Sequence, residues 1–317
     1  MKTKLYLLKI SLFFLITVLP LLGFCNVDYD HQSDVVYGYK NGLALIMDIY
    51  SPKTELNKAG VIVVIAGGFS SNPIDAHNVG NHYDVQSLLK AGYVVFATTH
   101  SSQPKYNADE ISYDIPRAVR FIRFNAENFR IDPLRIGIVG YSSGGHVSLM
   151  AGLSSLSINN NSKDPVEKVS SKLQAVVAYY PSTDLLNFGT KDKTILEHFH
   201  SVGFMLDAAF DFHAWNDTTK RFERIVDPKK LKEYYRKNSP ITYVSKDNPP
   251  ILLIHGDQDK LVPIQQSELL ISKLKELGVP NKLYVVEGKG HGFNFNNSDE
   301  NEYEEVLSWF EKFLLEK

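Results

Sequence analysis

Several short segments of the chain are made almost entirely of apolar, mostly β-branched residues. Val61–Ile65 and Ile251–Ile254 are two of them, and neither alternates apolar with polar positions. A strand that is apolar on both faces is stable only in a sheet that helices cover on both sides. This feature therefore predicts a mostly parallel sheet between two layers of helices.

Segments of helical length separate these strands along the chain. The candidate strands are Leu43–Tyr50, Val61–Ala66, Tyr93–Thr98, Arg135–Gly140, Leu173–Tyr180, Pro250–His255 and Lys282–Glu287. The candidate helices are His82–Ala91, Ile111–Asn128, Gly144–Leu156, Pro263–Leu277 and Asn301–Leu315. Such alternation is typical of a doubly wound α/β domain. The length of 317 residues, 44% of them hydrophobic, suits one large domain of this kind.

The N-terminal segment differs in composition from the rest of the chain. Lys2, Lys4 and Lys9 give it a positive start, and an almost wholly apolar stretch follows up to Phe24. We interpret residues 1–25 as a secretory signal peptide cut near Cys25, with residues 26–317 as the folded domain. A secreted or periplasmic location follows, without stable membrane insertion once the signal is removed. The alternative is an uncleaved membrane anchor, for which the apolar stretch is short.

Cysteine content and charge exclude several classes of function. Cys25 is the only cysteine, so removal of the signal would leave no disulfide framework, cysteine–zinc site or thiol nucleophile. The net charge is −2 and no long basic run occurs, so nucleic acid is not an expected partner. The spacings of His198 with His200 and of His77 with His82 do not match a helical metal site. We therefore expect no metal.

One long segment interrupts the alternation of strands and helices. Residues 185–237 lie between two strands and are rich in aromatic residues and histidines. A connection of this length has a structure or a function of its own. We predict a helical cap inserted over the carboxyl ends of the strands; the alternative is a surface excursion whose aromatic residues form a satellite core.

The turn after the candidate strand Arg135–Gly140 has the pattern Gly140-Tyr-Ser142-Ser-Gly144. Gly-x-Ser-x-Gly between a strand and a helix is the spacing of a nucleophile elbow, where glycines permit a sharp turn that exposes the central serine. Ser142 is the candidate nucleophile. Ser143 competes with it but has no glycine at the matching position before it.

Polar residues also follow two later strands. His255-Gly-Asp257-Gln-Asp259 follows one, and Gly288-Lys-Gly-His291 follows the other. Ligands of open α/β sheets bind beyond the carboxyl ends of the strands. Serine, carboxylate and histidine in this order match the catalytic order of α/β hydrolases. We assign Ser142 as nucleophile, His291 as general base and acid, and Asp259 as the residue that orients His291; Asp257 and the more distant Asp184 remain rivals of Asp259.

An acyl-transfer site also needs donors for the oxyanion. One is expected from the backbone N–H of Ser143, directly after the nucleophile. The other is expected from the glycine-rich loop after Val61–Ala66, where Gly68 or Phe69 would supply it.

Several motifs of the chain together resemble those of a known superfamily. The motifs are Asp114–Arg123, Ile131–His146, Tyr180–Asp184, Ser239-Pro240 and His255–Asp259. They resemble α/β-hydrolase-fold esterases of the hormone-sensitive-lipase and bacterial feruloyl-esterase (acetyl-esterase-like) group, and also the prolyl-oligopeptidase catalytic domain. The resemblance implies the α/β-hydrolase fold and a Ser-Asp-His triad at Ser142, Asp259 and His291. These esterases usually have a histidine before the oxyanion glycines, whereas this chain has Ile65 and Ala66.

The resemblance implies a serine esterase that cleaves a small-molecule carboxylic ester through an acyl-enzyme, with neither metal nor organic cofactor. A prolyl-oligopeptidase-like peptidase is the first alternative, although only about 30 residues precede the first strand, where that family has a propeller. A hydrolase of another acyl bond is the second alternative. A non-catalytic binding protein is the third, and it would be expected to lack a triad residue.

Overall fold

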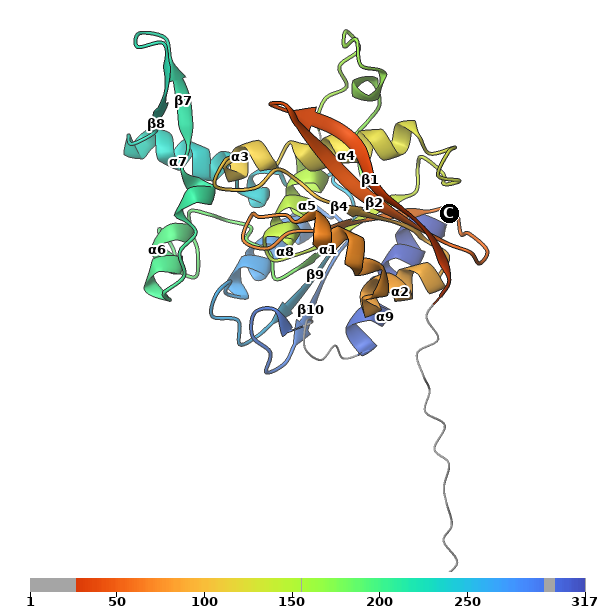
Figure 1. Ribbon diagram of the computed structural model, residues 1–317. Helices are drawn as coiled ribbons and strands as arrows, with labels where there is room; N and C mark the ends of the chain where they lie inside the picture. Colours follow the sequence, from red (N-terminus) through yellow and green to blue (C-terminus); the bar gives the residue numbers. More distant parts are fainter. Residues whose placement is uncertain (1–26, 155, 294–299, 317) are drawn as a thin grey trace, which may run out of the picture.

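The computed structural model describes residues 27–154, 156–293 and 300–316. They form an eight-stranded sheet in the order β1-β2-β4-β3-β5-β6-β9-β10 (Figure 1). The strands are β1 Tyr29–Lys40, β2 Leu43–Pro52, β3 Gly60–Val64, β4 Val94–Thr98, β5 Ile136–Tyr141, β6 Ala175–Tyr179, β9 Ile251–Gly256 and β10 Asn281–Val286. The pairs of β1 with β2 and β2 with β4 are antiparallel, and all other pairs are parallel. The predicted fold class is confirmed, and each predicted strand is present.

The helices cover both faces of this sheet. They are α1 Pro73–Asn78, α2 Tyr83–Lys90, α3 Ala108–Ile111, α4 Asp114–Phe124, α5 Ser143–Leu153, α6 Ile195–Ser201, α7 Pro228–Lys237, α8 Gln265–Glu276 and α9 Glu300–Phe310, which continues into a π-helical turn at Glu311–Leu315. Short 3₁₀ helices lie at Val79–Asn81, Pro165–Lys168, Asp207–Phe210 and Pro240–Tyr243. The predicted helix Ile111–Asn128 is shorter than expected and begins at Asp114.

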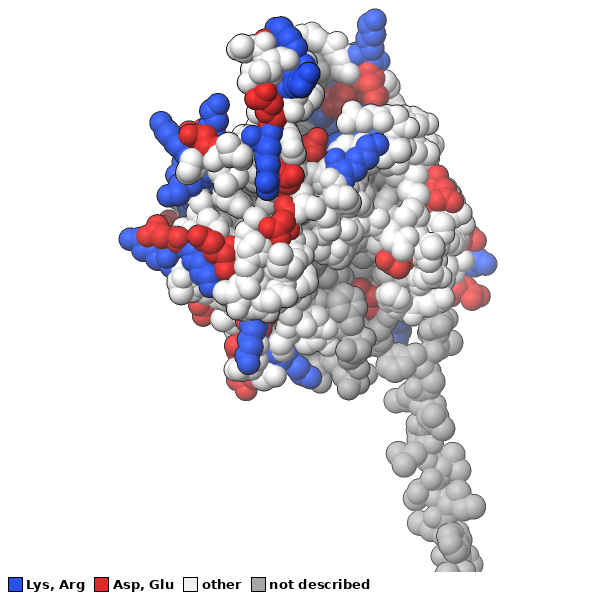
Figure 2. Space-filling view, turned by 60° about the vertical axis from the view of Figure 1, so that its left-hand side comes forward, with Lys and Arg blue, Asp and Glu red and all other residues white. Residues whose placement is uncertain are grey.

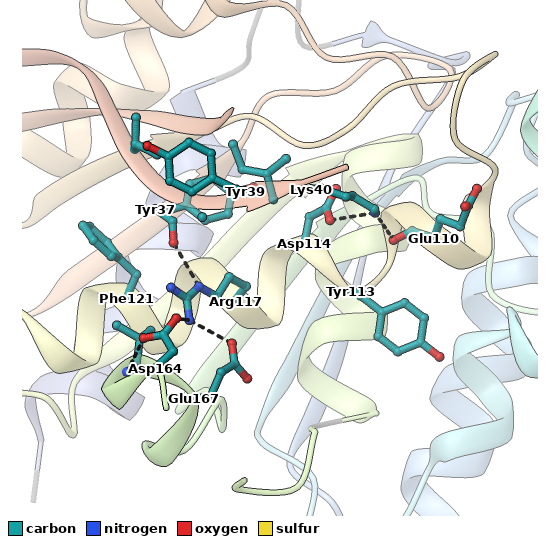
Figure 3. Close-up of a pocket in the computed structure, with 14 residues that line it drawn as sticks. Tyr37, Tyr39, Lys40, Glu110, Tyr113, Asp114, Arg117, Phe121, Asp164 and Glu167 are labelled. Carbon is teal, nitrogen blue, oxygen red and sulfur yellow. Dashed lines mark hydrogen bonds and ion pairs between the residues drawn. The ribbon is translucent and has the colours of Figure 1, made fainter. Parts of the chain in front are cut away.

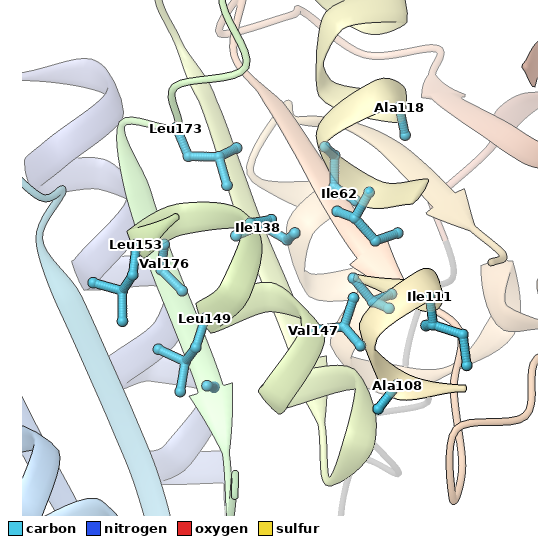
Figure 4. Close-up of a cluster of buried hydrophobic side chains, with 14 of the residues drawn as sticks. Ile62, Ala108, Ile111, Ala118, Ile138, Val147, Leu149, Leu153, Leu173 and Val176 are labelled. Carbon is cyan, nitrogen blue, oxygen red and sulfur yellow. The ribbon is translucent and has the colours of Figure 1, made fainter. Parts of the chain in front are cut away.

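Two hydrophobic clusters pack on the two faces of the sheet. Ile62 and Ile138 belong to the cluster under α4, α5 and α8, whereas their neighbours Val61 and Val139 belong to the cluster under α1, α2 and α9. Figure 4 shows Ile138 and Val176 of the sheet beneath side chains of α5. The unbroken apolar runs therefore reflect burial on both faces, as the sequence predicts.

Strand β1 was not predicted. It carries polar residues from Asp30 to Asp34, most of its positions are exposed, and it pairs on one side with β2. Its register with β2 shifts between Gln32 and Val35, which marks a β-bulge. An exposed edge strand of this kind has no continuous apolar run that sequence patterns could detect.

Charged residues attach β1 to α4 beside an open cavity of about 700 Å³ (Figure 3). Lys40 Nζ lies 2.8 Å from Asp114 Oδ1, and Arg117 Nη1 lies 2.7 Å from Asp164 Oδ2 and 2.8 Å from Glu167 Oε1. Apart from Glu110, whose carboxylate accepts the N–H of Asn107, the charged residues that line the cavity thus pair with one another. Because none of the predicted catalytic residues lines it, we interpret it as part of the β1–α4 interface.

Residues 185–237, which we call the cap, are only partly helical. They contain α6 and α7, but also an antiparallel hairpin of β7 His213–Asn216 and β8 Arg221–Arg224 that projects from the molecule (Figure 1). The rings of Trp215 and Phe222 pair across this hairpin at 5.3 Å. Cross-strand aromatic pairing stabilises such a hairpin although its strands are too short to give a clear sequence pattern.

On the face that Figure 2 brings forward, basic and acidic side chains are intermingled.

The buried aromatic residues of the cap belong to the main core, not to a separate one. Phe188, Phe199 and Phe210 lie in the same cluster as Phe69, which follows β3. The ring of Phe210 contacts that of Phe69 with centroids 5.5 Å apart. The cap thus packs on the loop at the carboxyl end of β3.

The predicted signal peptide at residues 1–25 lies outside the described residues. Among the helices that the structure describes, none combines the length and the apolar character needed to cross a bilayer.

Candidate active site

Ser142 occupies a strained turn between β5 and α5. Its backbone angles are φ 53° and ψ −117°, a conformation that residues other than glycine rarely adopt. A Cβ atom at Gly140 would overlap the carbonyl of Gly144, and one at Gly145 would lie 3.0 Å from the carbonyl oxygen of Tyr179. The glycines around Ser142 are therefore needed for the close approach of α5 to the ends of β5 and β6.

The structure brings Ser142, His291 and Asp259 together from the ends of three strands. Ser142 follows β5, Asp259 follows β9 and His291 follows β10. The Oγ of Ser142 lies 2.9 Å from Nε2 of His291, and Nδ1 of His291 lies 2.7 Å from Oδ2 of Asp259. In the neutral tautomer that this network favours, the Nδ1–H of His291 donates to Asp259 and Nε2 accepts from the serine hydroxyl.

Asp259 is buried and held from several sides. Its Oδ1 accepts hydrogen bonds from the backbone N–H groups of Leu261 and Val262, both at 2.9 Å. Burial raises its pKa, but hydrogen bonds from His255 and His291 outweigh this effect and lower the pKa to about 2. Asp259 therefore carries its charge at neutral pH, as a partner for a protonated His291 must.

The two rival carboxylates make other contacts. Oδ1 of Asp257 accepts the N–H of Gly288 at 2.7 Å, so this side chain holds the loop that carries His291. Asp184 accepts hydrogen bonds from Leu186 and Asn187 within its own loop. Of the three candidates, only Asp259 has a recorded hydrogen bond to His291.

The loop after β3 forms a tight turn, and the N–H groups at its tip form no hydrogen bond among the described residues. Gly67 and Ser70 exchange both backbone hydrogen bonds, at 2.9 and 3.0 Å, and Gly68 and Phe69 at the tip have positive φ values of 56° and 59°. Among the recorded hydrogen bonds of the described residues, none uses the N–H of Gly68 or Phe69. The N–H of Ser143 lies in the first turn of α5, where helices have no internal acceptor.

This turn is supported by groups that replace the histidine expected from the resemblance. The hydroxyl of Ser71 donates to the carbonyl of Ile65 and accepts the N–H of His100, and the hydroxyl of Ser102 accepts the N–H of Ser71 at 2.8 Å. The buried ring of His146 contacts Phe69 with centroids 5.3 Å apart. Burial lowers the pKa of His146 to about 4, so its ring is neutral when it packs there.

Sequence patterns missed two residues that contact His291 or Asp259. The buried ring of Tyr180 packs against His291 with centroids 4.5 Å apart. Nε2 of His255 lies 3.5 Å from Oδ2 of Asp259 and 2.8 Å from the carbonyl oxygen of Val262. His255 precedes the Gly-Asp-Gln-Asp motif directly, and this adjacency is the one signal that could have indicated it.

The sequence is similar to known proteins over most of its length. The family model BD-FAE matches residues 47–274. Esterase LipC of Mycobacterium tuberculosis is 26% identical over 84% of the chain and 60% of its own length, and the probable carboxylic ester hydrolase LipM of the same organism is 27% identical over 81% and 55%. The chain thus spans at most 60% of the length of these two relatives.

Solved structures share the fold. A truncated carbohydrate esterase from gut microbiota superposes with a TM-score of 0.71 at 24% identity, covering 92% of this chain and 98% of that one. Thermogutta terrifontis esterase 2 phosphorylated by paraoxon superposes with a TM-score of 0.62 at 19% identity, covering 92% and 94%.

The strain at Ser142 can be measured with two substitutions. Ser142→Gly and Ser142→Ala both remove the hydroxyl, but only glycine adopts a positive φ at no steric cost. We expect Ser142→Gly to be more stable than Ser142→Ala by about 1–2 kcal/mol in urea unfolding. At Ser154, where φ is −102°, the same pair of substitutions should not favour glycine. Equal stabilities of the two Ser142 variants would show that the turn carries no strain.

Proposed function

The chain belongs to the BD-FAE family, and on this premise we propose that it is a serine hydrolase that cleaves carboxylic esters through an acyl-enzyme. The observation that carries the proposal is the continuous hydrogen-bonded chain from Ser142 through His291 to Asp259. The names of the curated relatives, which are esterases or carboxylic ester hydrolases, support the same reaction class.

In the first half of the reaction, the hydroxyl of Ser142 attacks the ester carbonyl. A free serine hydroxyl is a poor nucleophile at neutral pH, and Nε2 of His291, 2.9 Å away, accepts its proton during the attack. Asp259 stabilises the resulting imidazolium through the hydrogen bond to Nδ1. His291 then donates the proton to the leaving alcohol, and the acyl group stays on Ser142.

The negative charge on the carbonyl oxygen is stabilised by backbone donors. We assign this role to the N–H of Ser143 together with that of Gly68 or Phe69. Removing one such donor typically costs about 2.7–4 kcal/mol of transition-state stabilisation. In the second half of the reaction, His291 activates a water molecule that releases the acid and restores Ser142.

The cap is the element that would determine which substrate groups fit beside the oxyanion site. The side chain of Leu206 lies 3.5 Å from the position of a Cβ at Gly68, and Phe210 packs on Phe69. Apolar side chains beside an oxyanion site favour an apolar or aromatic group on a small-molecule ester. Peptidase activity, hydrolysis of another acyl bond and a non-catalytic role are the competing functions.

Activity on 4-nitrophenyl esters from acetate to decanoate tests the proposal. We expect turnover by the wild type and a fall of several orders of magnitude in Ser142→Ala, because the nucleophile is lost. Ser154→Ala, which removes a hydroxyl at the other end of α5, should keep wild-type activity.

Labelling with paraoxon provides a readout that does not depend on the substrate chosen. Mass spectrometry should find a covalent phosphoryl adduct on Ser142 in the wild type and none in Ser142→Ala. A folded wild type that neither hydrolyses these esters nor reacts with paraoxon would refute the proposal; labelling without ester turnover would favour another acyl substrate.

Substitutions of Asp259 and of Asp257 should lower kcat to very different extents. Asp259→Asn replaces an acceptor of the His291 Nδ1–H by a donor or a neutral oxygen, so kcat should fall by about 10⁴-fold, as in other serine triads. Asp257→Asn keeps the carbonyl oxygen that can accept the N–H of Gly288, so kcat should change by only a few fold. Comparable losses in both variants would be inconsistent with Asp259 as the orienting residue.

We also propose that residues 1–25 direct export and are removed. Expression of the full chain with its own N-terminus in a bacterial host, followed by intact mass measurement, tests this. The mature protein should begin near Asn26. Recovery of the uncut chain in the membrane fraction would instead favour an N-terminal anchor.

A further inference from the structure

Four side chains of types that can bind metal ions meet at the β1–β2 edge of the sheet, and none of them is Ser142, Asp259 or His291. His31 and Asp34 belong to β1, Asp48 belongs to β2 and His77 belongs to α1. The β-bulge between Gln32 and Val35 is the segment that carries Asp34. The hydroxyl of Tyr50 in β2 donates to the carbonyl of Ala76 at 2.5 Å, so α1 packs directly on this edge.

Three of these residues are spaced as ligands of one cation. Nε2 of His77 lies 3.2 Å from Oδ1 of Asp34 and 3.7 Å from Oδ1 of Asp48, and one ligand atom from each residue lies within 4.8 Å of the others. Zinc bonds to histidine nitrogen and carboxylate oxygen measure about 2.0–2.2 Å, which places tetrahedral ligands about 3.3–3.6 Å apart. The three atoms therefore need little movement to surround a zinc-sized ion.

The fourth residue holds one ligand in position. The side chain of Asp48 is wholly buried, and its Oδ2 lies 2.5 Å from Nε2 of His31. The ring of His31 stacks on Tyr50 at 4.4 Å with an interplanar angle of 8°. Because His31 occupies Oδ2, and the N–H of Asp34 occupies only one lone pair of Oδ1, Oδ1 of Asp48 keeps a second lone pair, and this oxygen lies 3.7 Å from Nε2 of His77. Hydrogen bonds of this kind from outside the ligand set are typical of metal sites.

The charges at this site also favour a cation. Among the described residues, the recorded ion pairs of Asp34 and Asp48 involve only His31 and His77. A buried carboxylate beside a second carboxylate is costly unless a positive charge compensates it. Histidine protonation can supply that charge, and so can a metal ion. The exposure of Asp34, at 60% of its side chain, leaves an entry path and room for water ligands.

We propose that Asp34, Asp48 and His77 bind one divalent transition-metal ion, with Zn²⁺ as the best match, and that His31 orients Asp48 from outside the ligand set. The role is structural. Helix α1 begins at Pro73, three residues after the turn Gly67–Ser70. A metal that joins His77 to two strands would fix α1 to the sheet edge and thereby anchor the chain that leaves this turn.

The test uses the full chain after treatment with a chelator and its removal. Titration with ZnCl₂ in a calorimeter should show one binding site per chain. His77→Ala should weaken this binding by at least about 100-fold, and His31→Ala by about 10–100-fold. His200→Ala is the matched control, because Nε2 of His200 forms a single exposed ion pair with Asp207 at 3.0 Å without a second carboxylate; it should bind zinc as the wild type does.

Thermal unfolding gives a second readout that does not require ester hydrolysis. Zinc should raise the Tm of the wild type and of His200→Ala by several degrees, and should leave that of His77→Ala unchanged. If His77→Ala does not fold, Asp34→Asn at an exposed position decides in its place. Failure of the wild type to bind zinc at millimolar concentration would overturn the metal site and leave a cluster of histidine–carboxylate ion pairs. Zinc binding by His77→Ala and Asp34→Asn as tight as that of the wild type would do the same.

Discussion

The close approach of α5 to the ends of β5 and β6 is the constraint on which the candidate site depends. Gly140 and Gly145 allow this approach because side chains there would meet neighbouring backbone atoms. The same approach places Ser142 at a positive φ, and the N–H of Ser143 follows it directly in the first turn of α5. One packing constraint thus produces the candidate nucleophile and one candidate oxyanion donor together. Burial of the core on both faces of the sheet offsets the free-energy cost of the strained backbone at Ser142.

The geometry of the carboxylate partner follows from a similar close approach at the neighbouring strands. A Cβ at Gly256 would overlap the carbonyl of Lys289, so the glycine that ends β9 lets the loop after β10 lie against it. Asp257 then holds that loop through Gly288, while Asp259 bonds to His291. Two aspartates separated by one residue therefore differ in role because one faces the backbone of the loop and the other faces its histidine.

Sequence patterns predicted the parts of the fold that depend on local periodicity and on strand ends. The central strands were predictable because double-sided burial requires continuous apolar runs. The meeting of Ser142, Asp259 and His291 was predictable because each follows a candidate strand of the sheet. Strand β1 and the cap hairpin were not, because edge strands and short hairpins satisfy their hydrogen bonds without an apolar pattern. The contact of Tyr180 with His291 and the support of the Gly67–Ser70 turn by Ser71 and Ser102 depend on contacts between loops, which no spacing along the chain encodes.

The same limitation explains why histidine spacing along the chain could not indicate the metal site that we propose. That argument compared histidines close in sequence, whereas His77 meets its carboxylate partners from 29 and 43 residues away. Asp34 lies in the bulged segment of β1, and Asp48 is buried in β2. Edge strands need protection from pairing with other chains, and the β-bulge and the exposed charged residues of β1 provide it at this edge of the sheet. The antiparallel edge, which contributes none of the residues Ser142, Asp259 and His291, is thus connected through α1 to the turn that we assign to oxyanion binding.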